Sequence, residues 1–148
     1  MNRESHAVLA RWAADCAERV LYLYTHSSKD KDSRLKDALS IGRKWANGEV
    51  KTGVAMAAAR SAHAAAREAE DKAAIAAARA VGHAVGTAHA ADHSMGALLY
   101  SMKALEAAGN SSDAEFESQI AKLPDHLRDL VASGVILRWK KSGIKKAQ

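Results

Sequence analysis

The sequence predicts an all-α fold, organised as a single-domain bundle of about six or seven antiparallel, alanine-rich helices. Alanine is the most frequent residue, and the chain contains one proline, Pro124. No segment alternates apolar and polar residues with the period of two that a half-buried strand requires. At 148 residues, the chain is long enough for one domain with one hydrophobic core.

The first half of the chain contains three predicted helices. Between Ser5 and Tyr24, apolar residues recur every three or four positions and form a buried stripe, with Ser5 as the expected N-cap. A polar loop over 27–32 precedes a second helix from Ser33 to Ala46, which Asn47 and Gly48 end. The third helix begins near Thr52 and ends near Ala69.

The second half shows helical patterns from Ala73 to Ala88 and from Asp92 to Ala107. One straight helix over both segments would be about 52 Å long, more than a compact domain of this size normally holds. We therefore expect a break between Ala88 and Asp92, where Asp92 can serve as N-cap. A further helix is expected to begin at Ser112, with Glu115 completing a capping box, and the last at Pro124.

The formal net charge of +5 is concentrated at the end of the chain. The basic residues there are Arg138, Lys140, Lys141, Lys145 and Lys146. This distribution predicts a neutral helical domain over 1–137 and a basic C-terminal tail over 138–148. A solvated tail is the simpler interpretation, and an anionic partner is the alternative. The rest of the chain lacks the basic face that is typical of nucleic-acid-binding proteins.

The composition also indicates where in the cell the protein is expected. Cys16 is the only cysteine, so an intramolecular disulfide is impossible and the disulfide-stabilised secreted class is excluded. Charged residues interrupt the apolar residues near the N-terminus, which argues against a signal peptide. Other charged residues interrupt the alanine-rich middle and argue against a transmembrane span. We expect a cytoplasmic location.

The segment from Val81 to Ala108 carries the most information about function, because it places polar residues in an apolar helical pattern. These residues and the glycines among them are Gly82, His83, Gly86, His89, Asp92, His93 and Gly96. A polar group that is buried without a partner costs about 1–3 kcal/mol, so we expect specific partners here. Glycines inside helices indicate close packing, since each costs roughly 1 kcal/mol relative to alanine.

Three interpretations of the histidines remain open. The favoured one is a hydrogen-bonded network between helices, and the second is a partner-binding patch. In the third, His89, Asp92 and His93 share one face of a continuous helix and bind a metal ion, as in a metal-binding helical protein or hydrolase. Their spacing is similar to that of inverted zinc proteases, with aspartate in place of glutamate, but no clear third ligand follows.

The first helix carries a second candidate set: Asp15, Glu18 and Arg19, beside Cys16. An exposed, salt-bridged face is the simpler interpretation. In the functional alternative, Asp15 or Arg19 would reach inward to a histidine of the later segment, and Asp15 would then orient its imidazole. Cys16 lies on the apolar stripe and is expected to be an inert thiol of the core.

Three segments together resemble a known family: Trp12–Leu21, Arg43–Gly48, and the stretch from Gly82 through His93 to Tyr100. Over about Arg11 to Ala107, the chain is similar to small helical immunity proteins of bacterial polymorphic-toxin systems. The resemblance implies non-enzymatic binding and neutralisation of a cognate protein toxin in the cytoplasm of the producing cell, with no cofactor; an oligomer is compatible with it.

The resemblance brings no catalytic residues to this chain. It does single out the positions that match the family's recurring motif, which would form either its structural core or its binding surface. These positions are Asp15, Glu18, Arg19, His83, Thr87, His89, Asp92 and His93. One property differs from immunity proteins that oppose basic nucleases, which are usually acidic because opposite fields speed association.

Overall fold

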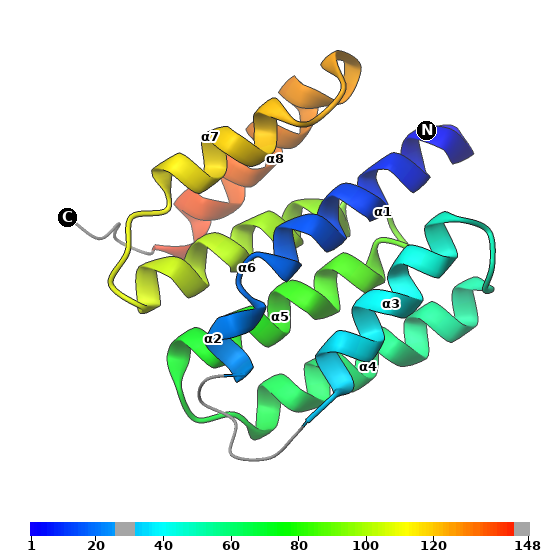
Figure 1. Ribbon diagram of the computed structural model, residues 1–148. Helices are drawn as coiled ribbons and strands as arrows, with labels where there is room; N and C mark the ends of the chain where they lie inside the picture. Colours follow the sequence, from blue (N-terminus) through cyan, green and yellow to red (C-terminus); the bar gives the residue numbers. More distant parts are fainter. Residues whose placement is uncertain (26–31, 144–148) are drawn as a thin grey trace.

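The computed structural model describes residues 1–25 and 32–143, and in these residues every regular element is a helix (Figure 1). The eight helices are α1 (Arg3–Glu18), α2 (Leu21–Thr25), α3 (Arg34–Ala46), α4 (Thr52–Glu68), α5 (Lys72–Gly86), α6 (His93–Ala107), α7 (Asp113–Ala121) and α8 (Asp125–Ser142). The all-α prediction is confirmed, and the expected number of six or seven helices was too low.

The difference in number arises in the first predicted helix, Ser5–Tyr24, which the structure divides into α1 and α2. At the break, the Val20 N–H donates to the carbonyl oxygen of Ala17, three residues earlier, at 3.2 Å. This spacing is shorter than the four residues of a regular α-helix. Val20 is fully buried, so the apolar stripe continues across the break and the periodicity does not reveal it. The cap was also misplaced by three residues: the Asn2 side chain accepts a hydrogen bond from the Ser5 N–H at 2.8 Å.

The predicted break between the two central helices is confirmed, because α5 ends at Gly86 and α6 begins at His93. Asp92 occupies the N-cap position of α6, as predicted, but its side chain makes no cap hydrogen bond. The Asp92 carboxylate instead forms an ion pair with Arg138 of α8, at 3.6 Å. A cap at the preceding junction is present, where the Asp71 carboxylate accepts a hydrogen bond from the Ala74 N–H at 2.9 Å.

Ser112 is the N-cap residue of α7, as predicted, but the expected capping box with Glu115 does not form. The Ser112 side chain makes no cap hydrogen bond. The Ser112 N–H donates instead to the Glu106 carboxylate, at 2.8 Å. The Glu115 side chain accepts from Gln119 and from Arg19 of α1. Glu115 therefore links α7 to α1 rather than closing its own helix.

Helix α5 forms the centre of the fold and packs against α1, α2, α3, α4 and α6 (Figure 1). Its alanines and valines are almost all buried, since small side chains let neighbouring helices approach closely from several sides. Helices α7 and α8 lie together on the far side of α6. The Trp12 indole of α1 donates to the Gln119 carbonyl oxygen at 2.8 Å, as expected for a buried tryptophan.

Helix α8 contains the start of the predicted basic tail. Arg138, Lys140 and Lys141 belong to this helix, which continues to Ser142 before the left-handed residue Gly143. Lys145 and Lys146 lie outside the described residues. Within the described ranges, none of the helices combines the length and apolar character needed to cross a membrane.

Candidate functional site

Three imidazoles meet where α4, α5 and α6 pack together. The ring centroids of His63 (α4) and His83 (α5) are 5.4 Å apart, and those of His83 and His93 (α6) are 5.7 Å apart. The Tyr100 ring stacks on His83 with a centroid distance of 4.9 Å and an angle of 13°. We refer to His63, His83, His93 and Tyr100 as the histidine stack.

A glycine makes room for each imidazole of the histidine stack. A Cβ atom on Gly82 would lie 2.5 Å from the His63 ring, and one on Gly96 would lie 2.5 Å from the His83 ring. A Cβ atom on Gly86 would lie 2.8 Å from the His93 ring. The close packing expected at these glycines is confirmed, and the groups that approach them are imidazole side chains.

Burial keeps the inner part of the histidine stack uncharged. It lowers the pKa of His83 to about 4, with His63 and His93 acting in the same direction. Burial also lowers the pKa of His63, helped by the positive charge of Arg79. The Arg79 guanidinium lies 2.7 Å from His63 Nδ1, and since a guanidinium only donates, this nitrogen accepts. Both rings are therefore neutral at pH 7.

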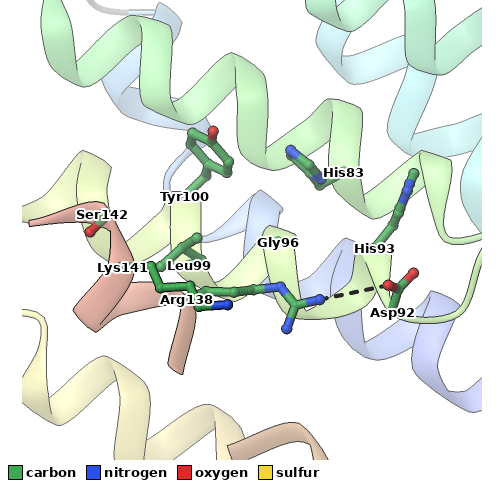
Figure 2. A pocket seen from close by; sticks show the side chains of 9 residues that line it. All are labelled: His83, Asp92, His93, Gly96, Leu99, Tyr100, Arg138, Lys141 and Ser142. Carbon is green, nitrogen blue, oxygen red and sulfur yellow. Dashed lines mark ion pairs between the residues drawn. The ribbon is translucent and has the colours of Figure 1, made fainter. Parts of the chain in front are cut away.

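An open pocket of about 420 Å³ lies beside the histidine stack, between α6 and α8 (Figure 2). Its lining residues are His83, Asp92, His93, Gly96, Leu99, Tyr100, Arg138, Lys141 and Ser142. Figure 2 shows the rings of His83, His93 and Tyr100 on one side and the side chains of Arg138 and Lys141 on the other. The pocket thus has an aromatic wall and a cationic wall.

The residues predicted from the Val81–Ala108 segment do not all reach this pocket. His83, Asp92 and His93 line it. His89 is exposed in the turn between α5 and α6, and Thr87 is fully buried. The Thr87 hydroxyl donates to the His83 carbonyl oxygen at 3.1 Å, and its own carbonyl oxygen accepts from His6 Nε2. The position of Thr87 is structural.

The geometry at His89, Asp92 and His93 does not favour the alternative metal site. The prediction required one continuous helical face, and the turn between Gly86 and His93 removes it. Asp92 is directed to Arg138. Throughout residues 1–25 and 32–143, no three His, Cys, Asp or Glu side chains are arranged to hold a metal ion.

The candidate set on α1 lies apart from the histidine stack and has other partners. Arg43 of α3 binds the carboxylates of Asp15 at 2.8 Å and Glu18 at 3.2 Å. Arg19 binds Glu115 at 3.2 Å. The structure therefore does not bring Asp15 to an imidazole, and it supports the simpler interpretation of an exposed, salt-bridged face.

Because these ion pairs are exposed, we expect Arg43→Ala to lower the free energy of unfolding by less than about 1 kcal/mol. The carboxylates of Asp15 and Glu18 are 59% and 61% exposed, and water already solvates them well. Urea denaturation at low and at high salt measures the effect, which should shrink as salt screens the charges. A salt-independent loss of more than about 2 kcal/mol would contradict the assignment to a surface ion pair.

Cys16 has the role expected from the sequence. Its side chain is fully buried, and burial raises the pKa of the thiol well above its usual value. A nucleophilic cysteine requires the thiolate and access to solvent. Cys16 is thus an unreactive residue of the core.

Sequence reasoning missed His63 and the pocket residues of α8. His63 stands among alanines in α4, and its neighbours His83 and Arg79 are on another helix, so no local spacing connects them. The available signal was Gly82, because a glycine inside a helix indicates that a bulky group approaches from elsewhere. Arg138 and Lys141 were assigned to a solvated tail because the basic residues cluster at the end of the chain. The structure shows that both belong to α8, which continues to Ser142.

Comparison with known proteins identifies the family. The family model described as "Imm-5 like putative immunity protein" matches residues 1–126. No curated protein and no solved structure matches the chain. The matched region includes α1 to α7 and the whole histidine stack, and it ends in the first turn of α8. The chain therefore belongs to the Imm-5 like putative immunity protein family.

Proposed function

We propose that this protein is the immunity protein of a bacterial polymorphic-toxin system, which binds and neutralises its cognate toxin without catalysing a reaction. The observation that carries this proposal is family membership over residues 1–126. The site of action would be the cytoplasm of the producing cell, where the toxin would otherwise reach its target.

The candidate site supports binding rather than turnover. Burial lowers the pKa values of His63 and His83, so these rings are weak bases and have no proton to donate at neutral pH. They are also packed against one another and seated on glycines. The pocket beside them exposes charged and aromatic side chains on a rigid helical frame. Such a preformed surface loses little entropy when a partner binds.

The test is protection by coexpression. The toxin encoded beside this gene should stop growth when expressed alone, and coexpression of the full chain should restore growth. The purified proteins, with the toxin catalytically inactivated, should form a complex with a Kd of about 1 nM, equivalent to roughly −12 kcal/mol. A toxin from an unrelated system is the control and should remain lethal. If the chain is folded and abundant but neither protects nor binds, the proposal is wrong.

A further inference from the structure

We propose that the pocket between α6 and α8 binds an oxyanion, and that in the immunity complex this oxyanion is a carboxylate side chain of the toxin. The second part rests on the proposed function. The lining residues present an aromatic wall from α5 and α6 and a cationic wall from α8 (Figure 2).

The Arg138 guanidinium is positioned in the pocket but is not fully used there. Its Nη1 atom contacts the Gly134 carbonyl oxygen and the Met95 sulfur, both at 3.2 Å. Its Nη2 atom lies 3.6 Å from the Asp92 carboxylate, well beyond the 2.7–2.9 Å of a charge-assisted hydrogen bond. The Asp92 side chain is itself 62% exposed. The guanidinium is therefore held in place with donor capacity to spare.

Lys141 supplies the second cation. It follows Arg138 by three residues on α8, so the two side chains share one face of the helix, and both line the pocket. Lys141 is exposed, and within the described ranges its ammonium group has no ion-pair partner. An incoming anion would meet two cations without having to break a strong existing pair.

On the opposite wall of the pocket, His83 and Tyr100 bring no negative charge that would repel the anion. His83 is neutral at pH 7 because burial lowers its pKa to about 4, and Tyr100 stacks flat against it. The rings of His83 and Tyr100 also occupy space that water would otherwise fill beside the cations, which reduces the screening of their attraction for the anion.

The charge of the pocket favours a carboxylate over a phosphate. Two cations and the Asp92 carboxylate give a formal charge of +1, which a single carboxylate neutralises. A phosphate dianion would leave excess negative charge beside Asp92. The planar guanidinium can bind two oxygens of either a carboxylate or a phosphate, so the preference rests on the charge balance. Because the pocket is open, an acidic side chain that protrudes from a protein surface can enter it.

The first experiment tests the oxyanion site with acetate and with inorganic phosphate. NMR spectra of the labelled protein would follow the Arg138 side chain and the His93 and Tyr100 rings. Acetate should produce saturable shifts, with weaker shifts from phosphate. Affinity should fall about tenfold or more in Arg138→Gln and in Lys141→Gln, since each loses a charged partner. Asp92→Asn should increase affinity, because it removes the competing carboxylate.

Lys140→Gln is the matched control. Lys140 is exposed, adjacent to Lys141 and outside the pocket lining, so the variant loses the same charge without touching the site. Its affinity for acetate should equal that of the wild type. The absence of saturable shifts, or equal losses in all three lysine and arginine variants, would overturn the oxyanion site. Tighter binding of phosphate than of acetate would overturn the carboxylate assignment. Circular dichroism would confirm that each variant is folded.

The second experiment repeats the series with the inactivated toxin. Arg138→Gln and Lys141→Gln should each weaken the complex about tenfold or more, Lys140→Gln should leave it unchanged, and Asp92→Asn should strengthen it. If the toxin binds all variants equally, the inference is wrong and the proposed function stands. If the wild type binds acetate but not the toxin, the proposed function fails, together with the assignment to a toxin carboxylate.

Discussion

Gly96→Ala is expected to lower the free energy of unfolding by roughly 1–3 kcal/mol, the usual cost of overpacking a filled core. The new Cβ atom would lie 2.5 Å from His83 Nδ1, 2.7 Å from its Cγ and 3.1 Å from its Cβ. The contact reaches the stem of the side chain, so a simple rotation of the ring cannot relieve it. A loss of stability would be informative, because replacing glycine by alanine inside a helix normally raises the stability by about 1 kcal/mol.

Urea denaturation of three variants would test the cause of this loss. Gly53→Ala is the matched control, since a Cβ atom there meets no neighbour within 4 Å, and it should be neutral or slightly stabilising. The double variant Gly96→Ala/His83→Ala should lose less stability than the two single changes predict together, because the clash needs both groups. If Gly96→Ala is as stable as the wild type, the ring does not occupy the position that the structure assigns to it.

Acidification is expected to destabilise the fold by up to about 3 kcal/mol between pH 6.5 and pH 4. The pKa of His83 is about 4 in the folded protein, against an ordinary value of 6.5. Between these values the unfolded chain takes up a proton that the folded protein does not, so stability falls as the pH falls. The lowered pKa of His63 acts in the same direction. Above pH 6.5 these two residues contribute no pH dependence.

Urea denaturation at several values between pH 7 and pH 4 would measure this slope. His83→Phe keeps a flat ring against Tyr100 and cannot be protonated, so its stability should depend less on pH than that of the wild type. His89→Gln is the matched control, because it removes an exposed imidazole that lies outside the histidine stack. Identical slopes for His83→Phe and the wild type would rule out His83 as the source.

The sequence predicted which residues are buried in helices well, but it predicted poorly which side chains from different helices contact one another. Periodicity located most helices, and helix length together with Asp92 located the break between α5 and α6. That same break contradicts the common face assumed for His89 and His93, because the two residues flank a turn. His83 was recognised as a polar residue in an apolar helix, but His63 was not, since the contact between them depends on how α4 packs on α5. Arg138 was recognised for its charge, and only the course of α8 brings it to Asp92.

Substitutions in the two walls of the pocket are expected to disturb the packing of the fold to different extents. The aromatic wall lies within the matched region and is locked by glycine contacts, so changes there disturb the packing of α4, α5 and α6. The cationic wall comes from half-buried and exposed positions of α8, beyond residue 126. If the pocket binds a toxin carboxylate as proposed, exchanging side chains on that helix would retune which toxin is recognised without rebuilding the scaffold that presents them.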